Sequence, residues 1–455
     1  MSRAESPPSP SRRGLTALLQ PLLVTLLITL LFTTSPSHGL SLAKRDAFTD
    51  VRGTIGDHSL TTVGRRPPGA YARTLPITPT TSIFTWYSKT PRDESDATSA
   101  FIVVHGVARN ANTYWSILNN AYTRARNASL GSADVNSIRV APLFFSTLED
   151  VGAYNETHLA WGDSNAWTAG EGSTNPPLSG ISSYAVLDSL LLRFANPIEY
   201  PNMKTITFVA HGGGAQMLQR YAMLGLPNPN DGRLSIRYVV GDPSSQLYLT
   251  QDRPVGVDTV SCPTWNDFRY GLRRSTAAYG IVSPLVAPAL FRSYAAKDVR
   301  YVVGLGDTDS EHGDQTCMAH AVGGPKRRNR NLAYWKYLNL LSATRSPEEL
   351  SGFPGSFPAL DPTVETNQTD IPTSTAWFNR RFRGVQLTHT LTLVPGAGHS
   401  ASKVYGSDAG RNALFADQES SGSGSMPDYS QELVGYTADA EGAKDYSDQD
   451  DDDDD

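Results

Sequence analysis

The chain has 455 residues, of which 39% are hydrophobic and 18% charged, an ordinary globular composition with room for one large or two medium domains. Its net charge of −6 is unevenly distributed, because the segment from Asp417 onward holds fourteen acidic residues and one lysine. The rest of the chain is mildly basic and shows no basic stripe. This pattern argues against nucleic acid as a partner.

Residues 1–45 have the layout of a secretory signal followed by a short pro-segment. Arginines precede an apolar stretch over residues 15–32, small or polar residues follow it, and the dibasic pair Lys44-Arg45 would leave Asp46 as the first mature residue. We therefore expect a secreted protein with no stable membrane span after cleavage. The apolar stretch is close to the lower limit for a membrane span, so a signal-anchored, membrane-tethered surface protein stays open as the alternative.

Strands and helices alternate along most of the remaining sequence, after an extended lead-in over residues 46–80. We expect strands at 82–88, 100–106, 137–145, 205–210, 236–240, 299–304 and 385–394, and helices at 113–126, 183–195, 331–341 and 401–415. This alternation predicts an α/β fold with a doubly wound, mainly parallel sheet over residues 81–416. It lapses at 244–297, where aromatic residues among Pro and Gly predict an irregular cap or lid.

The tail, residues 417–455, is rich in Ser, Gly and Asp, and we expect it to be a disordered acidic segment. The only two cysteines, Cys262 and Cys317, predict one disulfide in an exported chain. The N-x-S/T sequons predict glycosylation at Asn127, Asn155 and Asn367.

Residues 206–221 carry the most informative motif. An apolar, β-branched run is followed by three glycines and then by apolar residues at helical spacing. Strand, sharp turn and helix form the context that presents the serine of G-x-S-x-G enzymes. Gly212 occupies the serine position of the pentapeptide at 210–214, so no side-chain oxygen is available there to form an acyl-enzyme.

Two other uses of the glycine run do not fit. A dinucleotide fingerprint counted from Gly212 would need a glycine where Met217 stands, and no Lys-Ser/Thr follows as a phosphate-binding loop requires. We therefore expect no cofactor and no metal ion.

The order of motifs along the chain resembles that of the α/β-hydrolase superfamily, in its secreted, lipase- or esterase-like form, over roughly residues 80–416. These motifs are His105-Gly106, AHGGG at 210–214, GLGDTD at 304–309 and GAGHS at 396–400. The resemblance implies the chain order nucleophile, acid, histidine. It assigns these positions to Gly212, Asp307 and His399, with Asp309 as a competitor for the acid.

The resemblance also implies an oxyanion hole formed by backbone amides. The loop after His105 would supply the N–H of Val107 or Ala108, and Gly213 would supply the second. The alternative for the His105 side chain is a hydrogen-bonded core residue at the end of a strand.

These features predict a hydrolase-like protein whose nucleophile position is vacant. The expected function is non-catalytic or weakly catalytic binding of a small apolar, sugar or ester-like ligand. The alternative is an active carboxylic ester hydrolase that uses water activated by His399 or a substitute nucleophile such as Ser244 or Ser245.

Overall fold

The computed structural model describes residues 63–163, 165–229, 232–274, 279–280, 283–364 and 369–417. The predicted signal, the acidic tail beyond Asp417 and the sequon at Asn367 lie outside these residues. Within the described ranges, no helix has both the length and the apolar character needed to cross a membrane.

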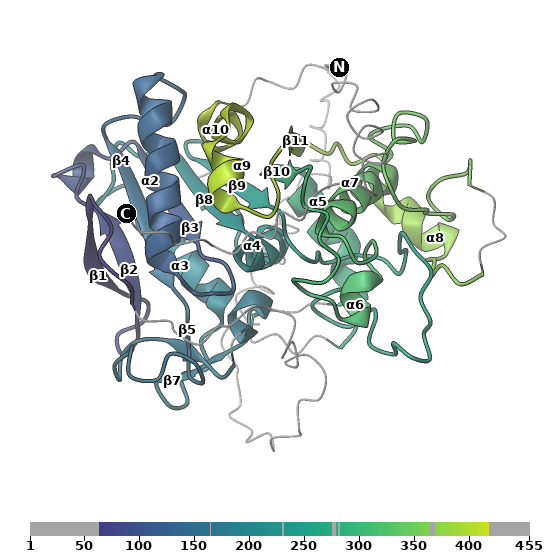
Figure 1. Cartoon of the computed structure of the whole chain (residues 1–455), viewed down its shortest axis with the longest axis horizontal. Coiled ribbons are helices and arrows are strands. Elements are labelled where there is room, and N and C mark those ends of the chain that lie inside the picture. Colours follow the sequence, from purple (N-terminus) through teal and green to yellow (C-terminus); the bar gives the residue numbers. More distant parts are fainter. Residues whose placement is uncertain are drawn as a thin grey trace, which may run out of the picture. The chain divides into compact units, whose positions relative to one another are not determined.

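Eight strands form one mixed sheet at the centre of the described part (Figure 1). In spatial order they are β1 (Ala70–Pro76), β2 (Ser82–Ser88), β4 (Ser137–Leu143), β3 (Ser99–Val104), β8 (Thr205–His211), β9 (Ser235–Gly241), β10 (Asp298–Gly304) and β11 (Thr390–Val394). The first two strands are antiparallel to their neighbours, and all pairs from β4 to β11 are parallel. The expected mainly parallel α/β sheet is confirmed.

Helices cover both faces of this sheet (Figure 1). One face is covered by α2 (Ala111–Asn127), α9 (Ala401–Gly406) and α10 (Asp408–Phe415). The other is covered by α3 (Ser183–Phe194), α4 (Gly213–Leu224), α5 (Ala287–Ala295) and α7 (Arg327–Ser342). The remaining short elements are α6 (Cys317–His320), α8 (Ala376–Asn379), a small sheet of β5 (Phe145–Ser146), β6 (Ala160–Trp161) and β7 (Ser173–Asn175), and 3-10 turns at Glu94–Asp96, Ala166–Ala169, Pro284–Val286 and Arg380–Phe382.

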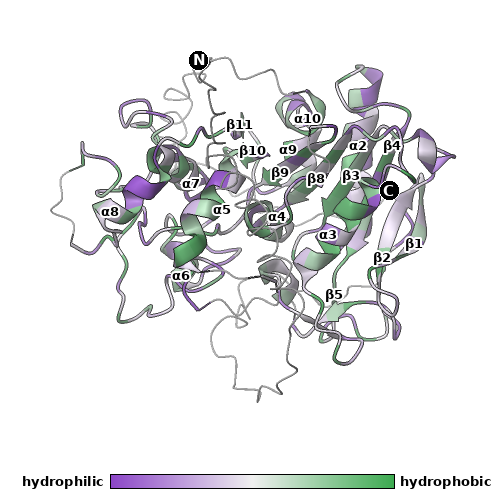
Figure 2. Cartoon of the chain, turned by 180° about the vertical axis from the view of Figure 1, so that it is seen from behind, coloured by the Kyte–Doolittle hydropathy of each residue, from purple (hydrophilic) through white to green (hydrophobic). Residues whose placement is uncertain are grey.

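The strands are apolar on both faces because each face packs against helices. In β8, Ile206 and Phe208 belong to the core on the α4 side, whereas Val209 belongs to the core on the α2 side. Figure 2 shows the same concentration of hydrophobic residues in the central strands β3, β8 and β9. This double burial produces the continuous apolar runs by which the sequence predicts these strands.

The structure differs from the sequence prediction in four places. The expected irregular segment 244–297 includes the 3-10 turn Pro284–Val286 and the helix α5 (Ala287–Ala295). The lead-in over residues 46–80 contains β1, a strand that the sequence analysis did not predict. The last strand begins at Thr390 and not at residue 385, and the helix expected at 401–415 is two helices separated by Ser407. Residues 244–274 contain no helix or strand and pack on α4 and α7, where Leu247 N–H donates to Gln219 and Tyr334 donates to the Leu247 carbonyl.

Candidate active site

Gly212 forms the sharp turn between β8 and α4. Its backbone has φ 58° and ψ −121°, a left-handed conformation that favours glycine. Its N–H donates to the Gly241 carbonyl over 3.0 Å, and its own carbonyl accepts from Gln216 N over 3.1 Å. A Cβ built on Gly212 would lie 3.1 Å from Nε2 of His399. A side chain at this position would therefore point directly at the imidazole.

The two following glycines are required by packing. A Cβ on Gly213 would collide with the Val107 side chain, and one on Gly214 would collide with the backbone carbonyl of His105. The first turn of α4 thus lies directly against the end of β3 and the loop after it. Gly212 differs from both, because its contact would be with the edge of one imidazole ring.

His399 lies on the loop between β11 and α9 and is held by a carboxylate. Its Nδ1 is 2.9 Å from Oδ2 of Asp307, which follows β10, and the side chain is 28% exposed. Because Asp307 accepts at Nδ1, the neutral ring carries its hydrogen there and leaves Nε2 free to act as a base toward Gly212. Burial lowers the pKa of His399 from 6.5, and the neighbouring Arg327 guanidinium lowers it further.

Arg327, the first residue of α7, is a second partner of Asp307 that the sequence analysis missed. Its Nε donates to Oδ1 and Oδ2 of Asp307 over 2.9 and 3.1 Å, and its Nη2 is 2.8 Å from Oδ1. Burial alone would raise the pKa of Asp307. The charges and hydrogen bonds of His399 and Arg327 outweigh this effect and hold that pKa well below its usual range.

A second buried histidine–carboxylate pair lies beside the first. Nε2 of His211 is 3.3 Å from Oδ2 of Asp242, and the His211 ring centroid is 4.6 Å from that of His399. Asp242 follows β9 with a φ of 42° and accepts from Gly304 N over 3.0 Å. Burial and the nearby Asp307 carboxylate raise the pKa of Asp242 well above 3.8, so its protonated form is favoured.

Two backbone amides lie close to the turn, as the predicted oxyanion hole requires. The Cβ position of Gly213 is 3.1 Å from Val107 N, so the two backbone segments are in contact. Within the described part of the chain, neither the Val107 nor the Gly213 N–H donates to an acceptor. Both amides are therefore without an acceptor among the described residues.

The His105 side chain is a structural element of the core. Its Nε2 accepts from Phe144 N over 3.0 Å, and its Nδ1 therefore donates to the Gly106 carbonyl over 2.8 Å. The ring also packs against Trp167 with centroids 4.7 Å apart. Complete burial lowers its pKa to about 3, so it is neutral at physiological pH. His105 thus anchors the loop that carries Val107.

The structure separates the other candidates from His399. Asp309 pairs with His312 over 2.6 Å, and the His312 side chain is 64% exposed. Ser245 is fully buried and hydrogen-bonded to Gln216 over 2.8 Å. Ser244 is also buried, and among the described residues no serine hydroxyl is hydrogen-bonded to His399.

The two sequons within the described residues lie at the surface. Asn127 is the exposed last residue of α2. Asn155 is exposed, and its side-chain oxygen accepts from the N–H and hydroxyl of Thr157 over 3.0 Å. Both side chains are therefore accessible for modification.

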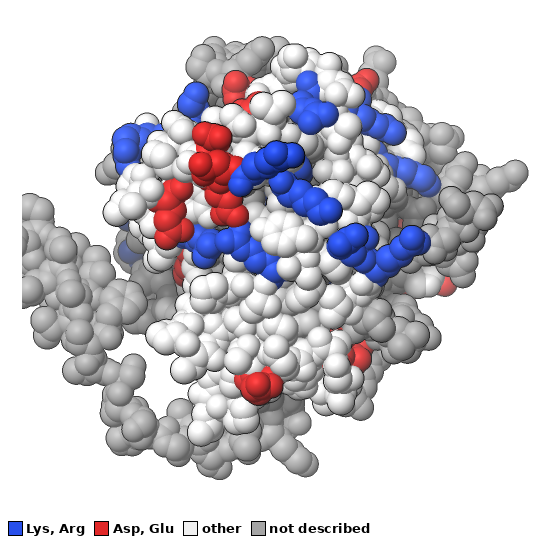
Figure 3. Space-filling view, turned by 90° about the vertical axis from the view of Figure 1, so that its left-hand side faces the viewer, with Lys and Arg blue, Asp and Glu red and all other residues white. Residues whose placement is uncertain are grey.

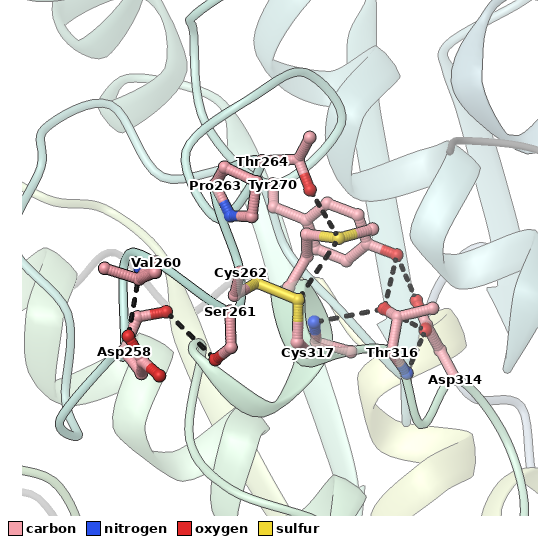
Figure 4. The surroundings of a disulfide bond; sticks show 12 residues. Asp258, Val260, Ser261, Cys262, Pro263, Thr264, Tyr270, Asp314, Thr316 and Cys317 are labelled. Atoms are coloured by element: carbon pink, nitrogen blue, oxygen red, sulfur yellow. Dashed lines mark hydrogen bonds between the residues drawn. A yellow bond between two sulfur atoms is a disulfide. The ribbon is translucent and has the colours of Figure 1, made fainter. Parts of the chain in front are cut away.

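Cys262 and Cys317 form the predicted disulfide (Figure 4). It joins the irregular 244–274 segment to the start of α6. Beside it, Tyr270 donates a hydrogen bond to Asp314, and Thr264 donates to the sulfur of Met318. The bond therefore fixes the irregular segment to the loop that follows β10 and Asp307.

No protein-family model matches the sequence, and no curated protein matches it either. Among solved structures, a poly(3-hydroxybutyrate) depolymerase from Bordetella parapertussis is 16% identical, with 81% of this chain and 94% of that chain covered and a TM-score of 0.47. A poly(aspartic acid) hydrolase from Sphingomonas sp. KT-1 is 18% identical, with coverages of 74% and 96% and a TM-score of 0.45. Carboxyl esterase 2 from Tuber melanosporum is 12% identical, with coverages of 87% and 95% and a TM-score of 0.36.

At these identities and TM-scores, the similarities carry no information about substrate. The chain's own topology is the stronger observation. Its mainly parallel sheet, its sharp turn after β8 and its loops after β10 and β11 carry residues 212, 307 and 399 in the chain order implied by the sequence motifs. This protein has the α/β-hydrolase fold.

Proposed function

We propose that this chain is a secreted α/β-hydrolase-fold protein that binds a small ester-like ligand without forming an acyl-enzyme. The proposal rests on the direction that a side chain at residue 212 would take. Residue 212 has the positive φ of a sharp turn between strand and helix, and a side chain there would point at Nε2 of His399. The residue is glycine, so this side chain is missing. Covalent catalysis by serine is therefore absent from the position that the fold provides for it.

The binding part of the proposal rests on groups that do not depend on residue 212. The amides of Val107 and Gly213 can donate to a ligand carbonyl oxygen, and backbone donors remain in place when a nearby side chain is lost. The partly exposed imidazole of His399 offers a third polar contact. A carbonyl or ester oxygen suits the two amide donors, whereas Nε2 of His399 can only accept.

A second candidate is slow hydrolysis by a water molecule that His399 activates. The hydrogen bond of 2.9 Å between Nδ1 and Asp307 favours it, because this contact orients the imidazole as a general base. Loss of the nucleophile from a serine triad costs about 10⁶ in turnover and leaves about 10³–10⁴ over the uncatalysed reaction. Any hydrolysis should therefore be slow.

Secretion is supported by the signal-like N-terminus, by the disulfide, which is typical of oxidising compartments, and by the exposed sequons. N-terminal sequencing of the mature protein separates this proposal from the membrane-tethered alternative. An N-terminus that precedes Leu15 would show that the signal is not cleaved.

The test of the proposed function combines a covalent probe with a steady-state assay. The full-length protein and its His399→Ala variant are treated with a fluorophosphonate and, separately, with p-nitrophenyl acetate. We expect no serine adduct by peptide mapping and at most slow turnover. A serine adduct near His399, or an ordinary enzyme rate that His399→Ala abolishes, would contradict the proposal. Saturable binding of a non-hydrolysable ester analogue, weakened in His399→Ala, would support it.

A further inference from the structure

A basic hollow lies on the face formed by β1, β2 and α2. Its volume is about 990 Å³, and it is lined by segment 65–69, Lys89 and the first two turns of α2. Arg65, Arg66 and Lys89 contribute three positive charges, and no carboxylate lines it. Figure 3 shows that face of the molecule, where Lys and Arg side chains lie across the upper half, next to a group of Asp and Glu side chains.

The three cations of this basic hollow have no carboxylate partner. All three side chains are exposed, and within the described residues none of them forms an ion pair. Arg73 on the neighbouring strand is different, because it pairs with Glu94. Helix α2 adds to the positive potential, since its first turn contains no acidic residue and its first two turns, at the positive end of its dipole, line the hollow.

The chain contains a segment with the complementary charge. Residues 418–455 hold thirteen acidic residues and one lysine, and six consecutive aspartates, 450–455, end the sequence. This concentration of negative charge matches a concave surface on which cations are unpaired.

The point at which the described chain ends allows this contact within one molecule. The Phe415 carbonyl accepts from Ser132 N over 2.9 Å, which places the end of the described chain beside the loop that follows α2. The hollow extends from Lys89 to the other end of this 17-residue helix, which is about 25 Å long at 1.5 Å per residue. The remaining 38 residues can span up to about 125 Å when extended.

We infer that the terminal aspartates, residues 450–455, bind the basic hollow of the same molecule through ion pairs with Arg65, Arg66 and Lys89. The path from the end of the described chain to the hollow can follow α2. On one side of this helix, the exposed residues Asn120 and Arg124 follow Ser116 at intervals of four. Attachment within one chain gives an effective concentration in the millimolar range, so several weak ion pairs suffice.

Zero-length carbodiimide cross-linking of the full-length protein tests this inference, because it joins a carboxylate to a lysine only when the two are in contact. Lys204 is the matched control. It is exposed, and it lies close to the end of the described chain, because its carbonyl accepts from Ser235 N on β9 and nearby Arg237 donates to the Leu414 carbonyl. Lys89 is also near that end, because the neighbouring Thr90 accepts from Arg139, whose guanidinium lies 4.0 Å from the Tyr122 ring, and that ring is 6.4 Å from the Phe415 ring. Proximity alone therefore predicts products with both lysines.

We expect about tenfold more product between 450–455 and Lys89 than between 450–455 and Lys204, in the monomer fraction at low salt. The double variant Arg65→Gln, Arg66→Gln should lower only the Lys89 product. Salt at 1 M, where the Debye length is about 3 Å, should abolish it. Equal labelling of the two lysines, or a Lys89 product insensitive to salt and to the double variant, would overturn the inference. Products confined to cross-linked dimers would assign the hollow to a second copy and would overturn it as well.

Discussion

Replacing Gly212 with serine restores one oxygen to a site whose other parts are in place. The backbone φ of 58° is unfavourable for a residue with a side chain, and such strain costs about 1–3 kcal/mol. The new Cβ would lie 3.1 Å from Nε2 of His399, so the imidazole must move by a few tenths of an ångström. We therefore expect Gly212→Ser to fold with a free energy of unfolding lower by about 1–3 kcal/mol.

The catalytic gain follows from the same geometry. The serine Oγ would lie within hydrogen-bond reach of Nε2, while Asp307 holds Nδ1 at 2.9 Å. An intact serine triad exceeds its serine-less form by about 10⁶ in turnover. Because this site has not been optimised around a hydroxyl, we expect part of that factor, a rise in kcat of at least about a hundredfold over the parent.

The assay compares Gly212→Ser with Gly212→Ala and with the double variant Gly212→Ser, His399→Ala. Alanine imposes the same backbone strain without an oxygen, so it isolates the contribution of the hydroxyl. Hydrolysis of p-nitrophenyl acetate and fluorophosphonate labelling of residue 212 are measured for each. If Gly212→Ser unfolds at the same denaturant concentration as Gly212→Ala yet gives no adduct and no added turnover, residue 212 does not face a working base.

Three further outcomes are expected. The Asp242 carboxyl has a raised pKa, so its stabilising contribution is present below pH 3.8 and is lost as pH rises through that raised value. In urea unfolding, Asp242→Asn should therefore gain stability relative to the parent between pH 5 and pH 8. A difference in the free energy of unfolding that does not change over this range would contradict this. Catalysis by the serine variant requires neutral His399, whose pKa is lowered, so its rate should reach half-maximum below pH 6.5, and a midpoint above that value would be inconsistent. Replacing both Cys262 and Cys317 by alanine should cost about 2–4 kcal/mol in the free energy of unfolding, and no loss would show that the cross-link does not constrain the unfolded chain.

The sequence predicts the central strands because helices bury both of their faces. Strand β2 has the bounds expected for it, and β8, β9 and β10 each differ by a residue or so at their ends. Strand β1 was missed because it lies at the edge of the sheet, and its exposed or half-exposed positions carry Arg73 and Thr74 in place of an apolar run. Residue pattern alone does not distinguish such a strand from an extended lead-in.

The proximity of Gly212, Asp307 and His399 was predictable for a topological reason. Each follows a parallel strand, and the carboxyl ends of β8, β10 and β11 meet at one edge of the sheet. Arg327 and Asp242 were not predictable in the same way. Contact between Arg327 and Asp307 depends on how the first turn of α7 packs, and Asp242 carries no motif around it beyond its place after β9.

The contact between Arg327 and Asp307 also explains why a complete histidine–aspartate pair can persist without a nucleophile. Asp307 is fully buried, and the Arg327 side chain is 5% exposed, so each is the charge partner of the other. Removing one member of such a buried pair typically costs 3–5 kcal/mol, because the remaining charge is left uncompensated. The fold therefore requires Asp307 whether or not the protein catalyses a reaction. The intact pair therefore does not by itself indicate covalent catalysis, which also requires a nucleophile at residue 212.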